Sequence, residues 1–384
     1  MLTRRNFVLT GSAGALSLGF APRLAFAQAA TDRRFVFIIQ RGAADGLGTV
    51  APVGDPAFAG QRGVLAQDFA GATKLDSMFA LHPNLKNVAQ LYAAKEALFV
   101  HAVASPYRDR SHFDAQNVLE TGGNAAYQLK DGWVNRLLGV LPDDARKAIA
   151  VAATIPMAMR GRVEVSSYAP SALPDASDDL LSRVSMLYAE DPHLHAIWQQ
   201  ATATRTLTGD LASDNGRNAA ATGALAARLL AAQNGARIAM IETGGWDTHA
   251  AQRGRLGGQL NGLDQMIASL KTGLGPLWSK TMILVATEFG RTVKVNGTGG
   301  TDHGTGSVAM LLGGAVQGGR VVADWPGLSD AALYEGRDLK PTAGLDTVIG
   351  SATAAHFGVD PQRAMAALFP GQKTAKALDG LVRV

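Results

Sequence analysis

The segment RFVFIIQRGAADG, residues 34–46, holds the first clear structural signal in the chain. Its apolar residues, from Phe35 to Ile39, run without interruption and end in a stretch rich in glycine and alanine. A short, wholly apolar run that ends at a turn is typical of a strand buried on both faces. We therefore predict a buried strand over residues 35–39, with the polar side chain of Asp45 just past its end.

Similar apolar runs recur along the chain and alternate with longer amphipathic stretches. Further strands are predicted at residues 97–100, 148–151, 238–241, 282–285 and 308–312. Residues 256–274 place apolar side chains every three or four positions, which indicates a helix. This alternation predicts an α/β fold, a three-layer α/β/α sandwich with a mostly parallel central sheet. Residues 155–215 are more polar, and we predict that they form an insertion or a cap over the sheet.

The composition excludes several classes of protein. The chain of 384 residues contains no cysteine, which excludes a disulfide scaffold, a thiolate metal site and a cysteine nucleophile. It is 47% apolar with a net charge of only +4, so it is not a disordered chain. The first 27 residues carry three arginines and no acid, which leaves 33 basic against 32 acidic side chains in the remainder. A nearly neutral body without basic clusters predicts no binding of nucleic acid.

The amino terminus has the features of an export signal. Arg4 and Arg5 precede an apolar run rich in alanine and glycine, and Ala25-Phe26-Ala27 offers a cleavage site between small residues. The paired arginines indicate the twin-arginine type, although the segment could instead be the first helix of the fold. The run is shorter than the ~20 residues that span a bilayer, so no stable membrane anchor is expected. We predict a signal peptide over residues 1–27, use of the twin-arginine export machinery, one domain over residues 28–384 and a periplasmic or secreted location.

Polar residues gather where the predicted strands end. Asp45 follows the first strand and, taken alone, is either a metal ligand or a turn residue. Arg108, Arg110 and Ser111 follow the second strand, just before a helical pattern. Ser111 either caps that helix or offers its hydroxyl at a helix N-terminus, where negative charge is stabilised, and the two roles are compatible. The two arginines would add positive charge for an anion.

The later strands are followed by residues that commonly bind metals. Asp247 and His249 come after one strand and either bind a divalent metal or only cap the next helix and face solvent. Glu288 and Arg291 come after the next strand, and His303 lies in the glycine-rich loop that follows. Ligands of such sheets bind beyond the carboxyl ends of the strands. We therefore expect these side chains to meet at one edge of the sheet.

These segments resemble the alkaline phosphatase superfamily, and more closely a secreted branch known as domain of unknown function 1501. The segments that carry the resemblance are Arg41-Gly42-Ala43-Ala44-Asp45-Gly46, Ser111-His112-Phe113-Asp114-Ala115-Gln116, Gly245-Trp246-Asp247-Thr248-His249, Glu288-Phe289-Gly290-Arg291-Thr292 and Asp302-His303-Gly304. The resemblance extends over roughly residues 34–372, nearly the whole chain after the predicted signal peptide. Together these motifs are specific, although each one alone is weak.

The resemblance implies an alkaline phosphatase-like fold and a metal centre of one or two divalent ions. Asp45 and Glu288 are the implied ligands of one ion, and Asp247, His249 and His303 those of the other. Zinc, manganese, magnesium and calcium are not distinguished by this ligand set. Where the superfamily commonly has Asp-His, this chain has Glu288 followed by phenylalanine, so one imidazole is missing and the second ion is in doubt.

The resemblance also implies a function, an exported hydrolase of phosphate esters or of related sulfate or phosphonate esters. Ser111 is the implied nucleophile, activated by a metal, and Arg108, Arg110 or Arg291 would neutralise the ester oxygens. The substrate would be a small-molecule or polysaccharide ester. A formylglycine-dependent sulfatase is excluded, because the chain has no cysteine and Ser105-Pro106-Tyr107-Arg108 has the wrong spacing. The alternative is a non-catalytic envelope protein that keeps the fold to bind a polysaccharide or another protein.

Overall fold

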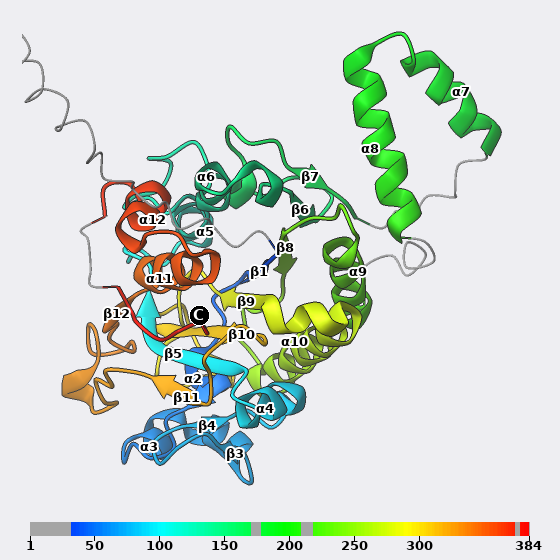
Figure 1. Ribbon diagram of the computed structural model, residues 1–384. Coiled ribbons are helices and arrows are strands. Elements are labelled where there is room, and N and C mark those ends of the chain that lie inside the picture. Colours follow the sequence, from blue (N-terminus) through cyan, green and yellow to red (C-terminus); the bar gives the residue numbers. More distant parts are fainter. Residues whose placement is uncertain (1–31, 170–177, 209–217, 373–376, 384) are drawn as a thin grey trace, which may run out of the picture.

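A computed structural model describes residues 32–169, 178–208, 218–372 and 377–383, so the predicted signal peptide lies outside the described residues. Its central feature is a large mixed sheet, drawn as arrows through the middle of Figure 1. The strands of this sheet are β1 (Arg34–Gln40), β5 (Ala97–Ala104), β6 (Ala148–Val151), β7 (Ser166–Ser167), β8 (Ile238–Thr243), β9 (Thr281–Ala286), β10 (Ser307–Leu312), β11 (Arg320–Val322) and β12 (Ala343–Gly344).

The strand order places β1 in the interior of the sheet. Among the described residues the sheet has nine strands, in the order β11-β5-β10-β9-β1-β8-β6-β7, with β12 pairing with β5. Strand β10 is antiparallel to both of its neighbours, and the other pairs are parallel. The predicted α/β fold with a mostly parallel sheet is therefore confirmed, and all the predicted strands belong to this sheet.

Helices cover both faces of the sheet and complete the three layers (Figure 1). One face is covered by α4 (Lys86–Ala93), α9 (Ala219–Ala231) and α10 (Gln252–Leu274), the other by α5 (His112–Thr121), α6 (Trp133–Val140), α11 (Leu345–Phe357) and α12 (Pro361–Leu368). Along β1, Phe35 and Phe37 pack on the side of α6 and α11, whereas Val36 and Ile38 pack on the side of α9 and α10. Because alternate side chains enter two different cores, every position of the run is apolar.

A second, antiparallel sheet was not predicted from the sequence. It consists of β2 (Val50–Ala51), β3 (Thr73–Lys74) and β4 (Ala80–Leu81), and the short helices α2 (Gly46–Thr49) and α3 (Phe58–Arg62) lie in the same part of the chain. Strands of two residues carry no periodic signal that sequence patterns can reveal.

The polar segment at residues 155–215 contributes both to the sheet and to two helices. Strand β7 extends the sheet beside β6. Helices α7 (Asp178–Tyr188) and α8 (Pro192–Thr208) pack through an edge-to-face contact of Tyr188 with Trp198, whose ring centroids are 5.9 Å apart. Both helices stand away from the sheet in Figure 1. A cap over the sheet therefore stays a prediction.

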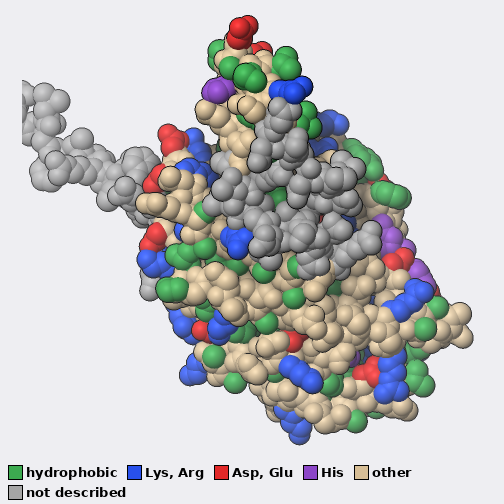
Figure 2. Space-filling view, turned by 90° about the vertical axis from the view of Figure 1, so that its right-hand side faces the viewer, with side chains coloured by type: hydrophobic (Ala, Val, Ile, Leu, Met, Phe, Trp, Pro, Cys, Tyr) green, Lys and Arg blue, Asp and Glu red, His purple; other side chains and the backbone are tan. Residues whose placement is uncertain are grey.

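The surface carries charges of both signs. On the face shown in Figure 2, basic and acidic side chains are interspersed, in line with their nearly equal numbers in the chain. Several of the exposed large apolar side chains lie on α7 and α8, where Leu187 is 75% exposed. Within the described ranges, no helix is long and apolar enough to cross a membrane.

Two buried histidines make the stability of the fold sensitive to acid. Burial lowers the pKa of His356 on α11 to about 3, although its Nε2 donates a hydrogen bond of 2.8 Å to the carbonyl of Arg34. Burial likewise lowers the pKa of His101 on β5 to about 4, although its Nε2 lies 2.8 Å from the carbonyl of Val50. Both rings are therefore neutral in the folded protein at pH 7, and folding opposes their protonation.

We expect the free energy of unfolding to fall as the pH is lowered from about 6.5 towards 4. A histidine with a depressed pKa binds its proton only after unfolding, so its contribution is complete above the unfolded pKa of ~6.5 and is lost below it. For His356 the loss amounts to roughly 2–3 kcal/mol by pH 4.5. Denaturant titrations at several pH values would measure it. His356→Gln keeps a donor but cannot titrate, so an unchanged pH dependence in this variant would contradict the assignment.

Candidate metal centre

Four parts of the chain bring the residues of a candidate metal centre to one edge of the central sheet. His112 is the first residue of α5, which follows the carboxyl end of β5. Asp247 and His249 lie in the loop after β8, and Glu288 follows β9. His303 comes just before β10, whose antiparallel direction places its start at the same edge. Of the residues expected to meet at this edge, Asp247, His249, Glu288 and His303 therefore lie together there.

Three imidazoles meet through their Nε2 atoms. The Nε2 of His303 lies 3.0 Å from the Nε2 of His112 and 3.0 Å from the Nε2 of His249. The Oδ1 of Asp247 lies 3.0 Å from the Nε2 of His249 and 3.3 Å from that of His303. Its Oδ2 lies 3.5 Å from the Nε2 of His112. His112, Asp247 and His303 form the inner group, whose ligand atoms all lie within 4.8 Å of one another.

The Nδ1 of each ring also faces an acceptor, and this favours one tautomer of His112 and of His303. The Nδ1 of His112 lies 2.8 Å from a Glu288 oxygen, and that of His249 lies 3.1 Å from a carboxylate oxygen of Asp302. The Nδ1 of His303 lies 3.0 Å from the carbonyl of Arg110. Carboxylates and a carbonyl can only accept, and for His112 and His303 the shorter contact with an acceptor is at Nδ1, so a neutral ring carries its proton there and presents a lone pair at Nε2. His249 faces a carboxylate through both nitrogens, Asp302 at Nδ1 and Asp247 at Nε2. Neighbouring lone pairs at this distance repel one another unless a cation lies between them.

The two rings of the inner group differ in their affinity for a proton. A hydrogen bond to Glu288, followed by the charges of Glu288 and Asp247, raises the pKa of His112 above its ordinary value although burial opposes this. Burial and the charge of His112 lower the pKa of His303. A positive charge on His112 therefore disfavours a second one on His303. A shared divalent cation would satisfy both imidazoles.

Asp247 is kept ionised by a buried arginine. Burial of Asp247 favours its neutral form, but the hydrogen bond and the charge of Arg291 outweigh it and hold the pKa of Asp247 below the usual range. The guanidinium of Arg291 is fully buried, and it also donates to the hydroxyl and the carbonyl of Thr301. Arg291 was expected to bind the ester oxygens. The structure instead places it behind Asp247, where it orients a candidate ligand.

Glu288 lies behind His112, with both of its oxygens occupied. Oε1 accepts from the Nδ1 of His112 at 2.8 Å, from the backbone N–H of Gly42 at 2.8 Å and from the amide of Gln116 at 3.2 Å. Oε2 accepts from the hydroxyl of Thr287 at 2.9 Å. Burial alone would raise the pKa of Glu288, but these donors lower it. Such a carboxylate orients a metal-binding imidazole without touching the metal.

Asp45 is not part of the cluster. Its carboxylate pairs with the guanidinium of Arg62 and accepts from the side-chain amide of Gln252, and both members of the ion pair are 1% exposed. Asp45 and Glu288 were expected to share an ion with Ser111 beside it. The hydrogen bonds of the described residues give these two carboxylates no common partner. The buried cation next to Asp45 is a guanidinium.

The two arginines near Ser111 also have partners within the protein. Arg110 binds Asp338, through its Nε at 2.9 Å, and Glu335. Arg108 donates to the carbonyls of residues 105 and 107, and burial lowers its pKa. Ser111 occupies the N-cap position of α5, but its side chain makes no capping hydrogen bond. The hydroxyl next to His112 is therefore not committed to the helix end.

Sequence patterns missed two members of the centre, His112 and Asp302. Both lie inside the motifs that carry the family resemblance and directly beside predicted site residues, Ser111 and His303, which is the signal that could have revealed them. Phe289, which stands where an imidazole was expected, stacks on His112 with ring centroids 5.0 Å apart and also contacts His303 at 5.2 Å. Phe289 thus borders the metal centre, and the imidazole beside it is that of His112 on α5.

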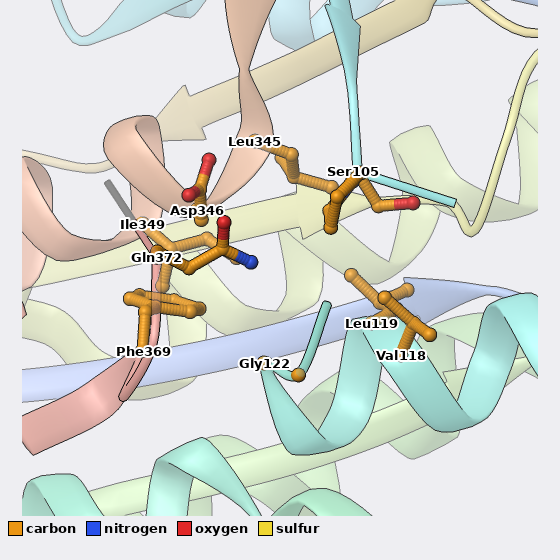
Figure 3. A pocket seen from close by; sticks show the side chains of 11 residues that line it. Ser105, Val118, Leu119, Gly122, Leu345, Asp346, Ile349, Phe369 and Gln372 are labelled. Atoms are coloured by element: carbon orange, nitrogen blue, oxygen red, sulfur yellow. The ribbon is translucent and has the colours of Figure 1, made fainter. Parts of the chain in front are cut away.

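A pocket near the carboxyl end of β5 is separate from the metal centre. Figure 3 shows it between α5, the start of α11 and the segment after α12. Its lining is largely apolar, with Ser105, Asp346 and Gln372 as polar members. Arg108 lines a second, more polar pocket that shares these three residues. Neither pocket includes a residue of the histidine cluster.

The fold and the cluster together define an α/β protein with a His/Asp group that could hold a metal ion. Residues 32–368 match the family described as protein of unknown function (DUF1501). Because the match spans most of the chain, the protein belongs to this family. The resemblance of the sequence to this family is thereby confirmed. No curated protein sequence matches the chain.

Several solved structures show a partial similarity. Ps i-CgsB in complex with k-i-k-neocarrahexaose has a TM-score of 0.38 and 11% identity, covering 87% of this chain and 74% of that one. A TAB5 alkaline phosphatase mutant with Mg bound has a TM-score of 0.34 and 12% identity, covering 77% and 95%. The phosphonate monoester hydrolase of Agrobacterium radiobacter has a TM-score of 0.29 and 13% identity, covering 76% and 70%.

Proposed function

We propose that this protein is an exported, metal-dependent hydrolase of phosphate esters or of related sulfate or phosphonate esters. The observation that carries the proposal is the convergence of three imidazole Nε2 atoms, with distances of 3.0 Å from His303 to each of the others, around the carboxylate of Asp247. Export through the twin-arginine machinery to the periplasm or beyond it belongs to the same proposal. It rests on the amino-terminal sequence alone.

The donor set fits a first-row transition ion. Three nitrogens and a carboxylate oxygen suit zinc or manganese, whereas calcium and magnesium prefer shells made of oxygen. In a tetrahedral zinc site, nitrogens at ~2.0–2.1 Å from the ion lie about 3.3 Å from one another. The observed distances of 3.0 Å are close to this value. His112, Asp247, His249 and His303 would hold the ion.

The donor set supports one ion rather than two. Asp45 is neutralised by Arg62, and the oxygens of Glu288 accept from His112, Gly42, Gln116 and Thr287. A second ion would have to displace these buried donors. The guanidinium beside Asp45 supplies the positive charge that a second ion would otherwise provide.

The chemistry then follows from the residues around the ion. A bound divalent ion would act as a Lewis acid that polarises the ester. Ser111 is half-buried at the N-terminus of α5, directly before His112, and its hydroxyl makes no capping bond. The peptide N–H groups at this helix end favour negative charge, which lowers the cost of ionising the hydroxyl. Ser111 is the nucleophile of the proposed reaction.

Substitution of Ser111 tests this assignment. We expect Ser111→Ala and Ser111→Asp to reduce hydrolysis of an activated phosphate monoester, such as p-nitrophenyl phosphate, by on the order of 10³-fold. Because Ser111 makes no capping bond, we expect Ser111→Ala to cost under about 0.5 kcal/mol of stability, less than the loss of a capping serine. Steady-state kinetics and thermal denaturation measure the two effects. Wild-type turnover in Ser111→Ala would rule out this nucleophile.

One observation favours a second candidate function, a metal-binding envelope protein that does not hydrolyse esters. Arg110 and Arg291, both expected to neutralise an ester, are bound by carboxylates of the protein. Metal analysis of the natively purified protein, followed by assays with phosphate, sulfate and phosphonate esters, separates the two functions. A stably bound ion without turnover of any of these esters would favour the binding protein.

A further inference from the structure

We infer that Arg41 and Gln116 are positioning residues of the metal centre, which orient Glu288 and thereby hold His112 in its metal-binding tautomer. The inference rests on the proposed metal site and extends it beyond the residues that would touch the ion. It assigns a role to the Arg41 motif after β1 and to Gln116, which ends the motif that begins at Ser111. The side-chain hydrogen bonds of these two residues go to each other and to carboxylates around the centre, not to the side chains of the inner group.

One face of α5 carries the three residues that link the centre to Arg41. His112, Gln116 and Glu120 are spaced four residues apart and so project from the same side of the helix. His112 and Gln116 both donate to Oε1 of Glu288, at 2.8 and 3.2 Å. Glu120 accepts from Arg41 at 2.9 Å. These three side chains therefore join the loop after β1, helix α5 and the loop after β9 in a single hydrogen-bond network.

Arg41 decides which way the amide of Gln116 points. The Nη1 of Arg41 donates to Oε1 of Gln116 at 2.9 Å, so the amide oxygen faces the guanidinium and the NH₂ group faces Glu288. The reversed amide would direct its oxygen at the carboxylate of Glu288 and its NH₂ at a cation. A guanidinium has no acceptor, so only one orientation satisfies both neighbours.

Arg41 is itself held in place by two carboxylates. Its Nη2 donates to Glu120 at 2.9 Å, and its Nε donates to Glu242 at 2.9 Å. The second oxygen of Glu120 accepts from the backbone N–H of Ala158 at 3.0 Å. Burial opposes the charge of Arg41, but the two carboxylates outweigh it and raise its pKa, so the guanidinium stays charged.

The amide of Gln116 matters because Glu288 has to present a lone pair to the Nδ1 proton of His112. The other donors to Glu288 are the backbone N–H of Gly42 and the hydroxyl of Thr287, so Gln116 is the side chain of α5, besides His112 itself, that holds Oε1 of Glu288. If Glu288 moves away from His112, the ring proton can shift to Nε2, where it blocks metal binding. Partners of this kind typically change metal affinity by ~10–100-fold.

Replacement of Gln116 with methionine tests the inference. Gln116→Met keeps the length of the side chain but removes the amide, and we expect its zinc affinity to fall ~10–100-fold. The measurement is competition for Zn²⁺ with a fluorescent chelator, using the full chain. Gln128→Met makes the same change in an exposed loop and should stay within about twofold of the wild type. Arg41→Gln, which removes the guanidinium but not the amide, should weaken zinc binding in the same direction.

A second readout separates this inference from the proposed function. In metal-free protein, ¹⁵N NMR of the histidine rings reports which nitrogen of His112 carries the proton. We expect the Nδ1–H tautomer in the wild type and in Gln128→Met, and a mixture of tautomers in Gln116→Met. If the wild type binds no zinc, the proposed function and the metal-positioning role both fail, but the tautomer of His112 still shows whether Gln116 orients Glu288. If Gln116→Met keeps both the wild-type tautomer of His112 and the wild-type zinc affinity, the inference is wrong.

Discussion

Replacing His303 with alanine should remove the bound metal and, with it, ester hydrolysis. Its Nε2 touches all three other candidate ligands: it lies 3.0 Å from the Nε2 atoms of His112 and His249 and 3.3 Å from Asp247. No other ring of the described cluster contacts both of its fellow imidazoles. We expect metal affinity to fall by at least about 100-fold, and turnover by on the order of 10³-fold or more.

The measurement is metal content per chain after native purification, together with hydrolysis of p-nitrophenyl phosphate at saturating zinc or manganese. His193→Ala is the matched control, because His193 is exposed on α8 and lies outside the cluster. His356→Ala is a poorer control, because His356 is fully buried and its loss would destabilise the fold. Equal metal content in His303→Ala and His193→Ala would exclude the cluster as the metal site.

Much of the fold can be predicted from the sequence because the central strands have an unusual composition. Strand β1 is buried along its full length, and its residues alternate between two cores, so no polar side chain interrupts Phe35 to Ile39. The same holds for β9 and β10. The short strands β2, β3 and β4 are stabilised by tertiary contacts instead, and their local sequence carries no signal.

The edge at which the site lies was also predictable, but the roles of its residues were not. The carboxyl ends of parallel strands share one edge, so Asp247, His249 and Glu288 could be expected to meet there. His303 reaches the same edge because β10, which it precedes, is antiparallel to β9. Whether a carboxylate there binds a metal depends on what else reaches it. Asp45 is reached by Arg62 and Gln252, which lie 17 and 207 residues away in the chain. Partners so distant leave no pattern in the local sequence.

The pair of Asp45 with Arg62 leads to the second large prediction, a loss of stability. Both side chains are 1% exposed, and Arg62 also donates to the carbonyls of Thr292 and Val293 at 3.3 and 3.2 Å. Removing one member of a buried ion pair leaves an uncompensated charge, which typically costs about 3–5 kcal/mol. We therefore expect Arg62→Met to lower the free energy of unfolding by this amount, as measured by denaturant titration.

The double variant Arg62→Met with Asp45→Leu should recover much of the loss, because it removes both buried charges and leaves apolar groups of similar size. Replacing a buried ion pair in this way is often neutral or even stabilising. Gln252 would lose its acceptor, which costs about 1–3 kcal/mol, so full recovery is not expected. If the double variant is no more stable than Arg62→Met, the ion pair stabilises the fold through the packing of its side chains rather than through its charge balance.

Metal analysis of variants at Asp45 and Arg62 also shows how many ions each chain binds. If the guanidinium of Arg62 takes the place of a second cation, the wild type and Asp45→Asn should each bind one ion per chain, because Asp45 touches none of the candidate ligands in the described cluster. The family resemblance implies the opposite, an ion bound by Asp45 and Glu288 that Asp45→Asn would release. Arg62→Met is the stricter test, because it leaves the buried carboxylate of Asp45 without its cation. If that variant folds with wild-type stability and takes up two ions, Asp45 is a metal ligand after all, and the guanidinium only fills its place when the second ion is absent.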